Sequence, residues 1–135
     1  MEPELFDRLL PLASAEVRAA KAELPDNLRP AAEAVATTFE PKPNAGFVAS
    51  GIEADTLGLF LGESMADPPS IHPQPTQIIL FLNNLWEFTG TDESTFLEEV
   101  RITYLHELGH YFGLGEDDLE ERLSLIHISE PTRPY

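Results

Sequence analysis

The segment from Phe96 to Tyr111 constrains the fold of this chain more than any other part of the sequence. Apolar residues recur along it at the spacing of an α-helix: Leu97, Val100, Tyr104, Leu108 and Tyr111. This periodicity predicts an amphipathic helix with one face on a core. Thr95 and Glu98 fit a capping box, so we expect the helix to begin between residues 91 and 95.

The sequence HELGH lies inside this predicted helix and suits a metal site. On an α-helix the side chains of His106 and His110 are about 40° apart around the axis, so both imidazoles can face one ion. Glu107 is turned by about 100° from His106, where its carboxylate can hold a water beside the metal and accept its proton. Zinc lowers the pKa of such a water to about 7. The pattern therefore predicts a catalytic Zn2+ site with Glu107 as the general base.

Two glycines follow the second histidine and predict a reversal of the chain. Gly113 and Gly115 can adopt the positive φ that ends a helix. The reversal would bring Glu116 back toward the histidines as a third ligand, and Asp117 and Asp118 are alternatives that the sequence does not separate. Three protein ligands leave the fourth position of zinc open, as a catalytic site requires.

The segment HELGHYFGLGE resembles the HExxHxxGxx(D/E) motif of the zincin metallopeptidases, and specifically that of the short bacterial zincin-like family called mini-zincins. The resemblance is strong over residues 96–122. It implies an α+β domain over residues 1–123, in which a small mixed sheet packs against N-terminal helices and the motif-bearing C-terminal helix. It also implies zinc ligands at His106, His110 and Glu116, and Glu107 as the general base of a zinc-dependent metallopeptidase that hydrolyses peptide bonds.

One departure from the resemblance concerns methionine. Larger metzincins have a methionine-containing turn after the motif, whereas Met1 and Met65 both precede it here. The small size of the chain also leaves no second subdomain to wall a deep cleft. An alternative function is therefore a zinc-stabilised binding or regulatory module that has a zincin fold and little or no turnover.

Charge and composition narrow the classes of partner. Asp and Glu outnumber Lys and Arg by 24 to 8, a formal net charge of −16 that repels nucleic acids and anionic membranes. We therefore expect a peptide or protein substrate. The chain has no cysteine, which leaves histidine and carboxylate as the strong metal ligands. We recognise neither a secretory signal nor a membrane-spanning apolar stretch, so we expect a cytoplasmic monomer or homodimer.

The N-terminal part of the chain predicts short helices followed by short strands. Pro11, Pro25 and Pro30 are expected to divide residues 3–36 into two or three helices, with Ser14 as an N-cap. Residues 35–39 (VATTF) and 46–50 (GFVAS) are β-leaning, and either is a candidate edge strand.

Two further segments predict the rest of the sheet. Residues 76–84 (TQIILFLNN) form a near-continuous apolar run, as expected of a strand covered on both faces, and a turn or short helical piece follows. Residues 56–63 (TLGLFLGE) are our candidate for an edge strand that binds an extended substrate. Gly58 and Gly62 share one face of this strand, which predicts close approach by another backbone.

The end of the chain differs in character from the rest. We expect residues 124–135 to be a non-native or disordered tail, because Pro131 and Pro134 fit no continuation of the preceding element. His127 and Glu130 in this tail are minor alternatives as metal ligands. His72 lies in a proline-rich loop, where we expect an exposed side chain without a role.

Overall fold

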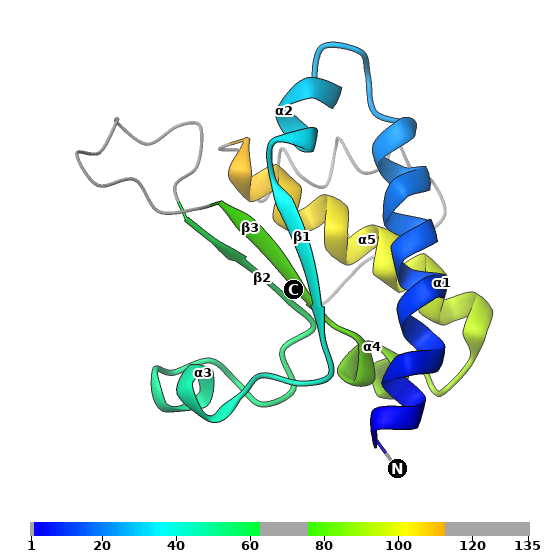
Figure 1. Cartoon of the computed structure of the whole chain (residues 1–135), viewed down its shortest axis with the longest axis vertical. Helices are drawn as coiled ribbons and strands as arrows, with labels where there is room; N and C mark the ends of the chain where they lie inside the picture. Colours follow the sequence, from blue (N-terminus) through cyan, green and yellow to red (C-terminus); the bar gives the residue numbers. More distant parts are fainter. Residues whose placement is uncertain (1, 63–75, 113–135) are drawn as a thin grey trace.

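The structure, a computed structural model, describes residues 2–62 and 76–112 (Figure 1). Its elements in chain order are the following: α1 (Glu2–Ala22), α2 (Arg29–Glu33), β1 (Ala36–Glu40), α3 (Ala45–Ala49), β2 (Gly58–Leu61), β3 (Gln77–Phe81), α4 (Leu82–Phe88) and α5 (Glu93–Tyr111). The predicted α+β class is confirmed, because helices pack against a small mixed sheet.

The sheet has three strands in the order β1-β3-β2. β1 runs parallel to β3, and β2 runs antiparallel to it. Four successive residues of β3, from Ile78 to Phe81, are buried, and alternate residues of a strand point to opposite faces. The predicted strand covered on both faces is thus confirmed for residues 77–81, whereas residues 82–84 of the predicted run begin the helix α4. The strand at β2 is also confirmed, and it lies at an edge of the sheet.

α1 is one continuous helix that contains Pro11, so the predicted break at this proline was wrong. The apolar residues on either side, Leu9 and Ala13, are both fully buried in the core. We attribute the continuity to this packing, because tertiary contacts supply most helical stability in proteins and can offset one lost hydrogen bond. Ser14 is therefore no N-cap; inside the helix its hydroxyl accepts a hydrogen bond from Arg18 Nη1 at 2.9 Å.

The two β-leaning segments that follow have different outcomes. Residues 36–40 form β1, as predicted, and this strand is the other edge of the sheet. Residues 45–49 form the short helix α3, so the prediction of a strand at 46–50 was wrong. The reason is a local cap, since Asn44 Oδ1 accepts a hydrogen bond from the backbone N–H of Phe47 at 2.9 Å.

α5 crosses behind the sheet in Figure 1 and has α1 beside it. Its predicted stripe is confirmed, since Val100, Tyr104 and Leu108 are buried in the core. The predicted capping box was wrong: the N-cap is Asp92, whose carboxylate accepts hydrogen bonds from the backbone N–H and the hydroxyl of Thr95. An ionised carboxylate interacts favourably with the positive end of a helix.

α5 is buried on more than the side that its apolar stripe predicts. It packs against α1, α4, β2 and β3. Even the charged residue Arg101 is buried, with only 8% of its surface exposed. Arg101 donates from Nε to Glu16 Oε2 at 2.8 Å and from Nη1 to Glu23 Oε1 at 2.7 Å. These ion pairs join the middle of α5 to the second half of α1 and the residues that follow it.

Within the described residues, 2–62 and 76–112, no helix is long and apolar enough to span a membrane.

Candidate metal centre

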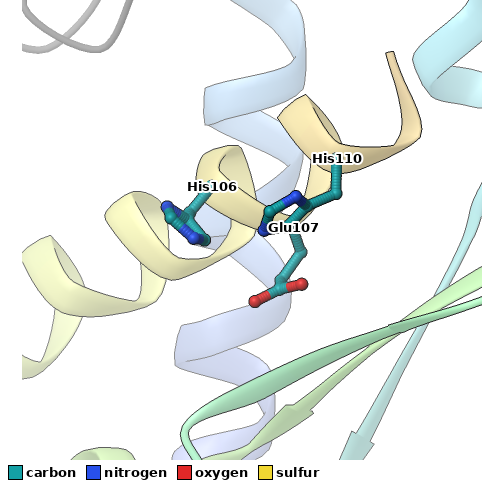
Figure 2. A group of neighbouring side chains, drawn as sticks. All are labelled: His106, Glu107 and His110. Carbon is teal, nitrogen blue, oxygen red and sulfur yellow. The ribbon is translucent and has the colours of Figure 1, made fainter. Parts of the chain in front are cut away.

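The last two turns of α5 present both histidines on one side of the helix. His106 is buried, with 8% of its surface exposed, and His110 is half-buried. The centroids of the two imidazole rings are 4.8 Å apart and the ring planes are inclined by 85°. Figure 2 shows the two rings next to each other on successive turns. The predicted convergence of these two residues is thus present in the structure.

Glu107 lies with the two histidines. One ligand atom from each of His106, Glu107 and His110 can be chosen such that all three lie within 4.8 Å of one another. In Figure 2 the carboxylate of Glu107 extends from α5 toward the sheet, below the two rings. Two imidazoles and a carboxylate are the donor types that zinc takes from proteins that lack cysteine ligands. The three side chains therefore fit a zinc ion, with the carboxylate of Glu107 beside the two imidazoles.

The rotation of α5 about its axis is fixed by its buried residues. Tyr104 precedes His106 by two positions and is turned from it by about 160° around the helix axis. It is fully buried in the core, and this burial, with a smaller contribution from the charge of Glu33, raises the pKa of its phenol to about 12. Tyr104 is therefore a core residue, as the sequence favoured, and its packing leaves His106 on the opposite side of the helix.

The edge strand β2 lies directly against the glutamate. A Cβ atom built on Gly58 would be 3.5 Å from Cγ of Glu107, 3.2 Å from Cδ2 of Leu80 and 2.6 Å from Cγ2 of Thr103. The close approach predicted at Gly58 is therefore present, although side chains rather than another backbone make it. Two residues further on, the ring of Phe60 packs against that of Tyr111, with centroids 6.0 Å apart.

The outer edge of β2 carries backbone groups that point away from the sheet. Phe81 donates its backbone N–H to the carbonyl of Leu57 at 3.0 Å, so the backbone of Leu57 faces β3. Gly58 and Phe60 lie one and three residues further along the strand. Because hydrogen-bonded residues alternate along an antiparallel strand, the N–H and C=O groups of Gly58 and Phe60 face away from β3. Among the residues that the structure describes, no strand pairs with this edge.

Thr103 is a residue of this site that the sequence did not single out. It is fully buried, and its methyl group makes the shortest contact with the position of Gly58. Its hydroxyl donates to Glu99 Oε2 at 3.5 Å, and Glu99 is itself 1% exposed. The signal in the sequence was spacing, since Thr103 precedes Glu107 by four residues and therefore shares its side of the helix.

The predicted third ligand lies outside the described residues. This holds for Glu116 and for its alternatives Asp117 and Asp118, as well as for the turn at Gly113 and Gly115. The same is true of His72, of His127 and Glu130, and of the predicted tail at residues 124–135. The metal ligand set and the role of Glu107 thus remain predictions.

Comparison with known proteins identifies the family of the chain. A comparison with curated proteins found no match. A family model described as zincin-like metallopeptidase matches residues 32–124, which is more than half of the chain. The match begins within α2 and includes the three strands and all of α5 with its HELGH sequence. The chain therefore belongs to the zincin-like metallopeptidase family.

Proposed function

We propose that this protein is a zinc-dependent metallopeptidase in which His106, His110 and Glu116 hold the metal and Glu107 is the general base. The observation that supports it most is the grouping of His106, Glu107 and His110, with ligand atoms within 4.8 Å, beside an edge strand. Membership of the zincin-like metallopeptidase family supports the same reaction class.

Zinc at this site would supply Lewis acidity, polarising the scissile carbonyl and lowering the pKa of a water so that a base can deprotonate it near neutral pH. Glu107 accepts the proton of the attacking water and then donates it to the nitrogen of the leaving amine. One carboxylate can serve both steps, because the proton it takes up in the first is released in the second. His106 and His110 act as neutral imidazoles, since only an unprotonated ring nitrogen binds a metal.

The substrate is an extended peptide that pairs with the outer edge of β2. The outward N–H and C=O groups of Gly58 and Phe60 would form backbone hydrogen bonds with it, as in other cases of strand addition. This mode of binding suits the location of Glu107, whose Cγ lies 3.5 Å from the Cβ position of Gly58. A peptide on this edge therefore lies beside the proposed base.

The substitution Glu107→Gln tests the proposal. We expect it to retain zinc at the wild-type stoichiometry, measured by elemental analysis, and to abolish cleavage of a broad peptide library. Glutamine keeps the size of the side chain but cannot accept the proton. His110→Ala is the companion variant and should lower the zinc content.

The rival function is a zinc-stabilised binding module with little turnover. It predicts a wild-type protein that binds zinc but cleaves no peptide in the library, and a Glu107→Gln variant that is indistinguishable from it. A wild-type protein purified without zinc, and unable to take it up, would contradict both functions.

A further inference from the structure

Gly58 is a glycine for reasons of space. It is not among the described glycines with positive φ, which are Gly51, Gly62 and Gly90, so its backbone conformation is open to any residue. What the position excludes is a side chain: a Cβ atom there would lie 2.6 Å from Thr103 Cγ2. Real Cβ atoms are not found that close to another carbon, so one of the two elements would have to move.

Thr103 has little freedom to yield to such a side chain. It is fully buried, and a β-branched residue in a helix has few allowed rotamers. Its hydroxyl lies 3.5 Å from Glu99 Oε2, and its methyl group is the nearest atom to the Cβ position of Gly58 on β2. The remaining way to relieve the contact is for β2 and α5 to move apart, because close-packed protein interiors transmit strain.

A shift of β2 would affect Glu107. A Cβ atom on Gly58 would lie 3.5 Å from Glu107 Cγ, at van der Waals distance, so the backbone of Gly58 passes beside the stem of this side chain. A second contact joins the rings of Phe60 and Tyr111, whose centroids are 6.0 Å apart. Phe60 is two residues beyond Gly58 on β2, and Tyr111 is about one helical turn beyond Glu107 on α5. The strand therefore packs on the helix on both sides of the turn that bears Glu107.

We propose that Gly58 and Thr103 are positioning residues for Glu107. The missing side chain at Gly58 allows β2 to pack on the methyl group of Thr103, and the strand then holds the glutamate stem in place beside the two histidines. The contact also fixes the separation between the carboxylate and the edge of β2. This inference rests on the proposed function for its catalytic consequence but not for its geometry.

A double-mutant cycle tests the proposal on the full chain. Gly58→Ala introduces the Cβ atom, and Thr103→Ser removes the methyl group that it meets while it keeps the hydroxyl. The two single variants and the double variant complete the cycle with the wild type. Gly46→Ala is the matched control, because Gly46 is exposed on α3 and the nearest atom to its Cβ position is 3.3 Å away, on Asn44. Zinc stoichiometry, kcat and KM are measured for each variant, and crystal structures give the location of the Glu107 carboxylate.

We expect Gly58→Ala to keep its zinc and to lose about tenfold or more in kcat, since small displacements of a catalytic group cost that much. KM should change by less than kcat, because the loss falls on the transition state. The double variant should recover most of the lost kcat, and Gly46→Ala should match the wild type. An unchanged kcat in Gly58→Ala, or a double variant as slow as Gly58→Ala, would overturn the proposal.

Failure of the proposed function gives a different result. A wild-type protein that binds zinc but cleaves nothing contradicts the peptidase proposal alone, and the crystal structures then decide the inference. Displacement of the Glu107 carboxylate in Gly58→Ala and its return in the double variant support it, and an unmoved carboxylate overturns it. If Gly58→Ala does not fold, the double variant carries the test: it folds if the contact is as described, and its failure to fold overturns the proposal.

Discussion

Arg101 on α5 donates a hydrogen bond of 2.7 Å from Nη1 to the carboxylate of Glu23, just beyond the end of α1. The same guanidinium donates from Nε to Glu16 within α1. α1 precedes the part of the chain that matches the family model, which begins at residue 32, yet these contacts hold it against the helix that bears the HELGH sequence. α1 is therefore part of the support of the candidate site.

Replacement of this arginine should destabilise the protein. Arg101→Met keeps much of the apolar stem but leaves the carboxylate of Glu16, with 22% of its side chain exposed, without its partner. We expect a loss of about 2 kcal/mol in the free energy of unfolding, because a partly buried charge without a partner is costly. Urea unfolding measures it. Glu23→Gln is the control and should cost less, since 55% of that side chain is exposed; an equal loss in both variants would contradict this account.

Tyr104→Phe should stabilise the protein. The hydroxyl of Tyr104 is buried, and no described residue forms a hydrogen bond with it. Removal of an unsatisfied buried polar group contributes about 1 kcal/mol to stability, and the ring can remain where it is. Thermal or urea unfolding at pH 7 checks the sign. A variant less stable than the wild type would show that the hydroxyl has a favourable partner.

The wild type and the Tyr104→Phe variant should also differ in how their stability changes with pH in alkaline solution. Burial raises the pKa of Tyr104 to about 12 in the folded state, above the value of about 10 in an unfolded chain. The phenol ionises first in the unfolded state, so its contribution to stability is complete below pH 10 and is lost as the pH rises toward 12. Unfolding free energies between pH 9 and 11 should therefore fall more steeply for the wild type than for Tyr104→Phe. Parallel curves would contradict the raised pKa.

Asp92→Ala should destabilise the start of α5. The Asp92 carboxylate accepts hydrogen bonds from Thr95, and these lower its pKa below the ordinary value of 3.8. A carboxyl group with a lowered folded pKa stabilises the protein above its unfolded pKa, and this contribution is lost as the pH falls through the folded pKa. We expect a lower unfolding midpoint for Asp92→Ala at pH 7 and a smaller difference from the wild type at pH 2. Asp92→Asn keeps a capping oxygen and should lie between the two.

The third metal ligand can be identified by a series of three variants. Glu116→Ala should lower zinc affinity by about tenfold or more, the loss expected when a site loses one of its supporting groups. Asp117→Ala and Asp118→Ala should have smaller effects. Competition with a chromogenic chelator measures the affinities. If an aspartate variant loses more than Glu116→Ala, the ligand is that aspartate.

If the peptide substrate pairs with the edge of β2, methylation of its backbone nitrogens should affect KM in a periodic way. In a peptide that the enzyme cleaves, each backbone nitrogen is methylated in turn. Successive residues of a strand direct their N–H groups to opposite sides, so methylation should raise KM at alternate positions only. Steady-state kinetics over such a series checks this expectation. An effect at a single position, or at none, would count against strand addition at Gly58 and Phe60.

The elements that the sequence predicted well are those whose signal is local. The spacing of apolar residues determined α5, because helical periodicity brings residues three and four apart to one side. The same geometry determined that His106 and His110 converge. The apolar run at residues 76–84 determined β3, which is buried on both faces.

The tertiary structure decided the features that depend on residues far apart in the chain. The continuity of α1 through Pro11 follows from packing of its buried face, and the depth of α5 follows from contacts with α1 and the sheet. The approach of Gly58 to Thr103 and Glu107 joins positions more than forty residues apart. No local pattern encodes such a contact, because it exists only after the strand and the helix have packed together.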